Sequence, residues 1–444
     1  MFKAITKLLL ISSLSILSTG ILRAQAQDNS PFSQFGLGDF IENDMPSSHA
    51  MGGLSATYHD FFEANIDNPA SLGFLQYTGL QVGLYMKRSR INRFEEKQTV
   101  WSGNLDHLSL NIPIINPLNE ALERRETDFS WGTSFSLRPY TQVGYFNQII
   151  DDVDSIGLVQ RSFTGSGGLY NVNWGNGVKY KNFALGVNLG YLYGTEIFDG
   201  ETTFLELENA YRNIFQSSNN YSGFQYRIGV LYEHPIDLKE ARKKEDNPSK
   251  LLSVGLFVTG QSRLNTHTDI TQLALNSNFI DVDTGLFIVD QLTYATLPVT
   301  WGAGFMYRRS ADFRFGFDYQ ASSWSDYENP ARPLEMRNSF RIGGGVAWIP
   351  DANSITNYLK RVEYRAGFYT MTDPRVIEGS QVKALAVTFG GGFPLILQRS
   401  IAWIQASIDV GRRTGGDNLR DSFARGKIGI ILNDNSWFIK GKYN

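Results

Sequence analysis

Alternation of apolar and polar side chains is the dominant pattern along this chain. From Phe313 to Gln320, the odd-numbered positions are all aromatic, while the even-numbered positions are Arg314, Gly316, Asp318 and Gln320. Phe183–Gly194 shows the same alternation with one exception, Leu192. A repeat of two residues is typical of a β-strand with different surroundings on its two faces. The pattern therefore predicts an all-β protein.

The length and chemistry of these runs distinguish between two all-β classes. Strands of a water-soluble β-sandwich also alternate, but they are usually about five or six residues long. Here the runs are longer, with large Phe and Tyr on one face and Gly or Arg on the other. Such strands suit lipid outside and a crowded polar lumen inside. We therefore expect a transmembrane antiparallel β-barrel.

Mapping this pattern along the chain gives about 14 strands. They are expected at 78–87, 105–112, 129–148, 172–180, 183–194, 222–232, 251–261, 299–308, 312–320, 339–348, 361–369, 384–392, 401–411 and 424–432. A further candidate at Leu158–Thr164 would make the number odd, so it is assigned to the second extracellular loop. The charge cluster Lys239–Asp246 is expected to be a solvated insert between two strands.

The N-terminus indicates the compartment. Lys3 and Lys7 precede an apolar run, Leu8–Leu22, and the small-residue pattern Ala24-Gln25-Ala26 follows. This arrangement predicts a secretory signal peptide at 1–26. After it, no apolar run approaches the 18 or so residues of a membrane helix. Export without such a helix favours the cell outer membrane as the location.

Composition excludes several function classes. The net charge is −3 and charged residues make up 19%, which leaves no basic face for nucleic acid. The chain has no Cys and five scattered His residues, without a close-spaced metal pair or a Gly-x-Ser-x-Gly elbow. We therefore expect no enzyme activity, no cofactor and no metal. Seven charged residues on inward parities are expected to form ion pairs that brace the wall inside the lumen, with a solute-selecting ring as the alternative: Arg227, Arg308, Arg314, Asp318, Arg341, Glu363 and Arg365.

Residues 27–76 lack the strand pattern but are rich in Phe, Leu and Gly. We expect this segment to fold into the lumen as a plug, followed by the barrel at 77–444. Met51-Gly52-Gly53 and Asn68-Pro69-Ala70-Ser71 resemble the N-terminal hatch of FadL-like outer-membrane transporters of hydrophobic compounds. Four further segments more closely resemble an uncharacterised FadL-like group, and the likeness spans most of the mature chain: Ser30–Asp39, Pro139–Tyr145, Tyr364–Gly367 and Trp437-Phe438.

The resemblance implies a hatch, a kinked third strand and an apolar entry groove made by the third and fourth extracellular loops. The hatch would include Gly52, Gly53, Asn68, Pro69 and Ala70. Pro139 and Gly144 would form the kink, since Pro cannot donate to a sheet ladder. The substrate loop would present Leu273, Leu275, Phe279, Ile280 and Phe287.

Two main functions remain open at this point. The first is passive uptake of hydrophobic or amphipathic small molecules, such as long-chain fatty acids, with lateral release into membrane lipid. The alternative is a non-transporting barrel that serves as a scaffold or partner subunit of an outer-membrane secretion or assembly complex. A general porin is third, because the expected plug would obstruct polar solutes. An apolar path through the lumen would favour uptake, whereas a lumen filled by Arg–Asp pairs would favour the scaffold.

Overall fold

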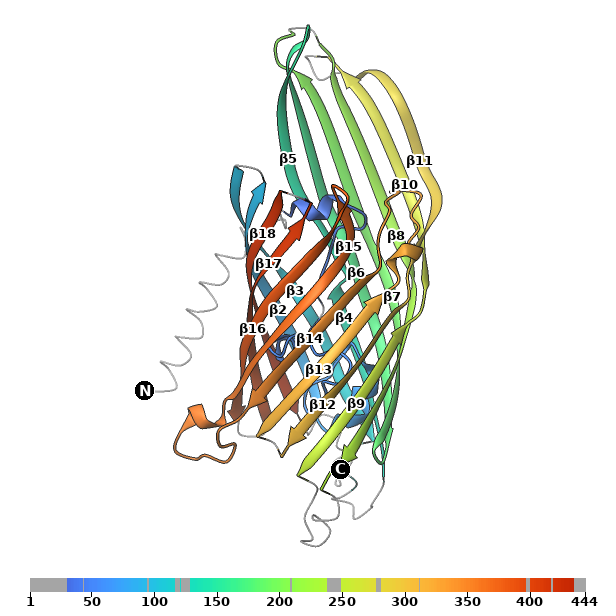
Figure 1. Cartoon of the computed structure of the whole chain (residues 1–444). Coiled ribbons are helices and arrows are strands. Elements are labelled where there is room, and N and C mark those ends of the chain that lie inside the picture. Colours follow the sequence, from blue (N-terminus) through green and yellow to red (C-terminus); the bar gives the residue numbers. More distant parts are fainter. Residues whose placement is uncertain are drawn as a thin grey trace, which may run out of the picture.

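Most of the chain forms one closed antiparallel sheet around a folded N-terminal segment (Figure 1). The computed structural model describes residues 30–434 except 43, 94–95, 116–119, 121–127, 208–209, 238–248, 277–280, 311, 397–399 and 417. The expected signal peptide, the charge cluster Lys239–Asp246, Phe279 and Ile280 lie outside the described residues. Among the described residues, no helix is long and apolar enough to cross a membrane.

The N-terminal segment contains short elements only. They are η1 (Pro31–Gln34), β1 (Asp39–Phe40), α2 (Pro46–His49) and η2 (Pro69–Phe74). The first wall strands are β2 (Thr78–Arg93), β3 (Glu96–Ile115), β4 (Phe129–Pro139), β5 (Thr141–Val153), β6 (Gly157–Tyr180), β7 (Phe183–Phe204) and β8 (Arg212–Pro235). Next come β9 (Lys250–Thr259), β10 (Ser262–Leu275), β11 (Asp281–Leu297), β12 (Thr300–Arg309), β13 (Phe313–Ser322) and η3 (Trp324–Asp326). The chain continues with β14 (Ser339–Trp348), η4 (Tyr358–Arg361), β15 (Glu363–Ile377), β16 (Ser380–Ile396), β17 (Ser400–Gly415) and β18 (Leu419–Asp434).

In the described part of the chain, the wall has fourteen strands, as the alternation predicts. Eighteen strands form the sheet, but β1 belongs to the N-terminal segment and three wall strands are each broken into two parts. The broken strands are β4 with β5, β9 with β10, and β11 with β12. β18 pairs with β2 from Asp434–Thr78 to Leu419–Arg93, which closes the barrel.

Side-chain direction follows the predicted parity. In the β12–β13 ladder, Tyr307 lies opposite Phe315 and Arg308 lies opposite Arg314. Phe315 is exposed on the outer surface, whereas Arg314 is buried toward the lumen. Apolar side chains thus face lipid and polar ones face inward, because adjacent residues of a strand point to opposite faces.

Three expected loops are instead ordered strand. Leu158–Thr164 is part of β6, and most of 195–221 and 262–298 extends β7, β8, β10 and β11. Together β5–β8, β10 and β11 form a tall wall that rises above the rest of the barrel (Figure 1). Sequence alternation fails there because these extensions are rich in Ser, Thr, Asn and Gln. Outside the membrane, a strand can pair through its backbone without apolar side chains on its outward face.

Candidate functional site

The N-terminal segment 30–76, called the plug below, is purely acidic. It contains six carboxylates and neither Lys nor Arg. These carboxylates are Asp39, Glu42, Asp44, Asp60, Glu63 and Asp67. All six are largely removed from solvent inside the lumen. An acidic segment in that position needs cationic partners, because an unpaired buried charge is costly.

Arginines of the wall surround the upper plug. Arg375 and Arg413 contact the Asp39 carboxylate at 2.6 and 3.0 Å between Nη1 and Oδ1. Arg375 also donates to the backbone carbonyls of Phe32 and Gly38 at 2.8 and 3.0 Å. The Arg375 guanidinium therefore both pairs with the Asp39 carboxylate and holds the plug backbone that precedes it.

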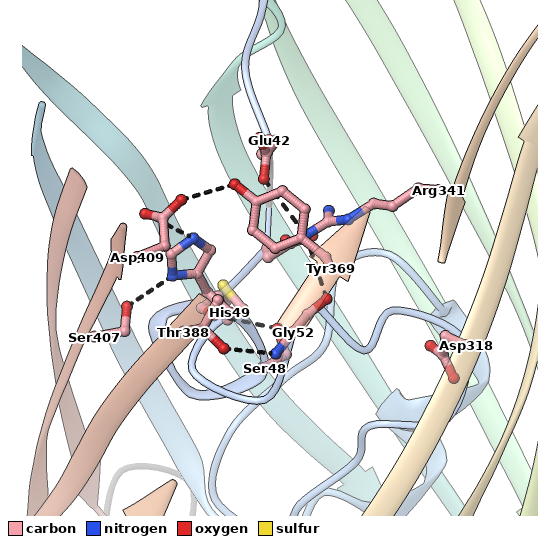
Figure 2. A network of polar contacts seen from close by, with 12 residues as sticks. Glu42, Ser48, His49, Gly52, Asp318, Arg341, Tyr369, Thr388, Ser407 and Asp409 are labelled. Atoms are coloured by element: carbon pink, nitrogen blue, oxygen red, sulfur yellow. Dashed lines mark hydrogen bonds and ion pairs between the residues drawn. The ribbon is translucent and has the colours of Figure 1, made fainter. Parts of the chain in front are cut away.

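A second cluster forms around Glu42 and Asp44, the next carboxylates of the plug, and Figure 2 shows Glu42 and Arg341 within it. Arg341 lies 2.7 Å from Asp44 Oδ2 and 3.4 Å from Glu42 Oε2. Arg425 contacts the same Glu42 oxygen at 2.9 Å. These side chains come from β14 and β18, so the plug links distant parts of the wall.

His49 at the end of α2 joins this cluster to the facing wall. Its Nδ1 lies 3.0 Å from Ser407 Oγ, and its Nε2 lies 3.4 Å from Asp409 Oδ1. Tyr369 donates its hydroxyl to Asp409 at 2.7 Å. Figure 2 shows that these groups converge around α2 from several strands.

The lower plug repeats the arrangement. Arg314 lies 2.8 Å from Asp60. Asp67 accepts from both Arg138 and Arg227 at 2.8 Å. At Asp318 the carboxylate belongs to the wall instead of the plug. It accepts a hydrogen bond from the backbone N–H of Ala56 in the plug at 2.6 Å.

The predicted lumen ion pairs are found for six of the seven inward charges, whereas Asp318 accepts hydrogen bonds from the plug at Ala56 N and Thr57 Oγ1. Arg227, Arg314, Asp318 and Arg341 bind the plug as described above. Arg308 pairs with Glu233 at 3.0 Å, and Glu363 pairs with Arg365 at 2.5 Å. What the sequence reasoning missed was the opposite half of the network, the plug carboxylates with Arg375, Arg413 and Arg425. The absence of Lys and Arg from residues 30–76 was the available signal.

All five expected hatch residues lie within the plug and against the wall. Gly52 and Gly53 adopt φ of 79° and 76°, and Gly52 N donates to Thr388 Oγ1 at 3.1 Å. Asn68 caps η2 by accepting from Ala70 N at 3.1 Å, and its amide donates to Ala56 O at 2.5 Å. Pro69 and Ala70 pack so closely on Gly186 of β7 that a Cβ there would overlap them.

The third wall strand breaks beside Pro139. β4 ends at Pro139, β5 begins at Thr141, and β5 does not continue the β3 ladder among the described residues. The upper part of β3 is therefore separated from β5 by a gap. Gly144 lies in β5, where its carbonyl accepts from Ser30 N at 2.9 Å.

The plug covers the lower part of this gap from inside. β1 pairs with β5 through Asp39–Gln142 and Phe40–Thr141. Ile41 N donates to Tyr140 O at 3.2 Å, and Tyr85 of β2 reaches across to Gln142 at 2.9 Å. The break in the wall is thus occupied by the chain's own backbone and side chains.

An apolar cluster joins the plug to the upper wall. Leu37 of the plug packs with Trp324, Tyr327 and Met336, which follow β13. Wall residues on five strands complete it: Leu169, Leu192, Tyr221, Leu264, Ala295 and Leu297. Beneath it, a cavity of about 250 Å³ is lined on several sides by charged groups, including Asp39, Glu42, Lys87 and Arg341. Charged side chains of both the plug and the wall thus reach into the cavity beneath the cluster.

The expected substrate loop is a β-hairpin, β10–β11, at the top of the tall wall. Leu273 and Leu275 are half-buried, and Phe287 is 68% exposed. None of these three contacts the plug in the described part of the chain. The structure therefore does not bring the hairpin residues together with the plug or with Pro139.

The described residues contain no group of three side chains able to hold a metal ion.

A family model described as BamG matches residues 1–444. No curated protein sequence matches the chain. Several solved structures share its fold. The Pseudomonas putida toluene transporter TodX is 14% identical, with a TM-score of 0.54 over 90% of this chain and 99% of TodX. The Ralstonia pickettii toluene transporter TbuX is 12% identical, with a TM-score of 0.52 over 88% and 99%. A Pseudomonas aeruginosa FadL homologue is 12% identical, with a TM-score of 0.53 over 87% and 96%.

These comparisons establish an outer-membrane β-barrel and correct two expectations. Assignment to the FadL-like transporter family was wrong, because the family model is BamG and the likeness to FadL-like barrels extends only to the fold. Passive uptake of hydrophobic molecules by lateral release was also wrong, on the same family match. The buried ion pairs between plug and wall agree with this correction. The family match agrees with the expectation of a non-enzymatic barrel.

Proposed function

Because the chain belongs to the BamG family, we propose that it is a non-transporting subunit of the outer-membrane β-barrel assembly machinery. In this role the barrel is a rigid membrane body that presents surfaces to protein partners. The family model covers the entire chain, so the proposal concerns the plug, the barrel and the tall wall together.

The structural observation that carries the proposal is the charge-locked plug. Wall strands far apart in sequence each contribute an arginine to the same short segment: Arg138, Arg227, Arg314, Arg341, Arg375, Arg413 and Arg425. Moving the plug would break several buried pairs at once, and breaking one such pair typically costs about 3–5 kcal/mol. A rigid, filled barrel is suited to holding partners in place and poorly suited to passing solutes.

The tall wall supplies a surface for such partners. On its inner face, Tyr145, Phe163, Phe198 and Phe215 surround a hollow of about 390 Å³ over Gly200. Phe163 and Phe215 are exposed by 41% and 43%. Aromatic side chains that stay exposed around a hollow are typical of protein interfaces.

The first test is composition of the native complex. An epitope-tagged full-length chain would be expressed in its own cells, cross-linked, and purified from outer membranes. We expect known subunits of the assembly machinery to copurify, and depletion of the chain to lower the amounts of folded outer-membrane barrels. A folded, membrane-inserted chain that captures no machinery subunit and whose loss leaves these barrels unchanged would overturn the proposal.

The second test locates the interface. A photo-cross-linking residue would replace Phe163 or Phe215 on the inner face, with Thr164 and Gln216 as controls. These controls lie on the same strands but point to the outer face, because neighbouring residues alternate. We expect cross-links to machinery subunits from the first pair and few from the second. Equal cross-linking by both pairs would contradict the assignment of the inner face as the interface.

A further inference from the structure

A group of unpaired cations lies on the outer surface of β16, β17, β18, β2 and β3. It comprises six exposed side chains: Lys383, Arg412, Arg420, Arg88, Arg90 and Lys97. None has a carboxylate partner among the described residues. This cationic arc lies on the side of the barrel away from the β10–β11 hairpin (Figure 1).

Strand register places these cations in adjacent rows. The uppermost row runs Lys383–Thr414–Arg420–Asn92–Lys97, and the next runs Leu385–Arg412–Ser422–Arg90–Thr99. A third row runs Val387–Val410–Ala424–Arg88–Trp101. Residues directly opposite one another in a ladder share a face. The six cations therefore form one continuous surface, and these three rows contain no Asp or Glu.

The surface directly beneath the arc is apolar. The next row down includes Phe389, Ile408 and Met86, which are exposed by 52%, 46% and 59%. Below it, Leu84 and Ile428 continue the same face. An outward band of this kind lies against lipid acyl chains in a membrane barrel. The cations thus begin where the acyl region ends.

Trp101 marks this boundary. Its ring lies 5.7 Å from the Arg88 guanidinium, and it is exposed on the outer face. Trp side chains are enriched where a membrane protein crosses from hydrocarbon to headgroups. Its position assigns the two rows above it to the level of the headgroups.

The other side of the molecule has the opposite charge. The outer face of the tall wall carries four carboxylates, Asp199, Glu201, Asp269 and Asp290, against two arginines: Arg212, which pairs with Glu201 at 3.3 Å, and Arg263. Positive charge is therefore concentrated over one part of the circumference instead of spread evenly around the rim.

We propose that the cationic arc binds phosphate groups of lipids in the outer leaflet. Arg guanidinium groups donate paired hydrogen bonds that match phosphate oxygens, and each Lys or Arg near a membrane surface adds to anionic-lipid binding. The apolar rows beneath would hold the acyl chains of the same lipid. This combination selects a phosphorylated lipid over a free anion, which would use only the upper rows.

The test compares two triple variants of the full chain. Arg90→Gln/Arg412→Gln/Arg420→Gln removes the centre of the arc, while Lys181→Gln/Lys250→Gln/Arg309→Gln removes three exposed cations from the other end of the barrel. Both sets point to solvent or lipid and leave the plug network intact. Native mass spectrometry of the detergent-solubilised proteins would measure binding of phosphatidylglycerol, with diacylglycerol as the phosphate-free lipid.

We expect the arc variant to lose at least about tenfold in affinity for phosphatidylglycerol and the control variant to change little. Binding of diacylglycerol should be weak for all three proteins. Unchanged heat-modifiable gel mobility would establish that the variants are folded. Equal phosphatidylglycerol binding by both variants would overturn the proposal. Full competition by millimolar inorganic phosphate would also overturn it, because it would show a free-anion site.

Discussion

Gly52 shows how closely the plug is fitted to the wall. Its φ of 79° is unfavourable for residues with a Cβ. A Cβ at this position would also overlap the backbone oxygens of Phe368 and Gly344. A Cβ at position 52 would therefore cause both backbone strain and steric overlap. Rotating a side chain cannot relieve the overlap, because the overlapped atoms belong to the backbone.

We predict that Gly52→Ala destabilises the folded barrel by at least about 2 kcal/mol more than Gly379→Ala. Gly379 is a matched control, since its φ is 78° and nothing lies within 4 Å of the added Cβ. Urea unfolding in lipid vesicles would give both free energies. Similar losses of unfolding free energy for the two variants would contradict this prediction, because they would mean that the backbone at Gly52 shifts at little cost to make room for the added Cβ.

The buried pairs make a separate prediction at Asp39. Asp39→Asn leaves Arg375 and Arg413 without their shared carboxylate, and losing one member of a buried pair costs about 3–5 kcal/mol. Asp151→Asn breaks the exposed Arg161 pair, which should be worth at most about 1 kcal/mol. Unfolding free energies and protease sensitivity of the plug would be compared. Equal effects would contradict a charge-locked plug.

Among the structural elements, β7 has two parts with different surroundings. Its lower part alternates between lipid and lumen up to Tyr193, and its upper part belongs to the tall wall. Glu196 lies in the upper part and is completely buried beside the apolar cluster. Burial raises the pKa of its carboxyl to about 8, although Arg332 and Tyr221 act in the opposite direction.

This shift predicts that stability falls as pH rises. Between about pH 5 and 8 the folded protein holds a proton on Glu196 that the unfolded chain releases. The free energy of unfolding should therefore decrease across this window, by on the order of 1 kcal/mol per pH unit. Glu196→Gln should make this dependence less steep by the contribution of one carboxyl, and Glu201→Gln on the outer face of the same strand should leave it unchanged. Thermal unfolding in detergent at several pH values would show whether the two variants differ.

For the molecule as a whole, the sequence predicts the membrane-spanning part of the wall but neither its tall extensions nor the function. Runs such as Phe183–Gly194 indicate the fourteen strands because lipid on one face and lumen on the other favour alternation, whereas the upper parts of β7, β8, β10 and β11 lack that constraint. The partners of the plug were harder to foresee, since Asp39 and Arg375 are 336 residues apart and the charge pairing depends on the closed barrel. The resemblance of the Gly52-Gly53 and Asn68-Pro69 segments to a FadL-like hatch gave the right fold and the wrong family. Apolar residues such as Phe287 suggested a substrate groove, but in the described part of the chain they lie on the paired strands β10 and β11.

A fixed plug makes a final prediction that separates a subunit from a solute channel. Phe40 of β1 lies directly opposite Thr141 of β5, so cysteines at these two positions should form a disulfide that fastens the plug across the gap. The chain has no native cysteine, so no other pairing competes.

We expect the oxidised Phe40→Cys/Thr141→Cys protein to copurify with the assembly machinery and to restore folded outer-membrane barrels in depleted cells as well as the wild type does. The two single-cysteine variants are the matched controls. Restoration by the single variants with failure of the oxidised double variant would show that the plug must move during function, and the barrel would then be more than a rigid partner.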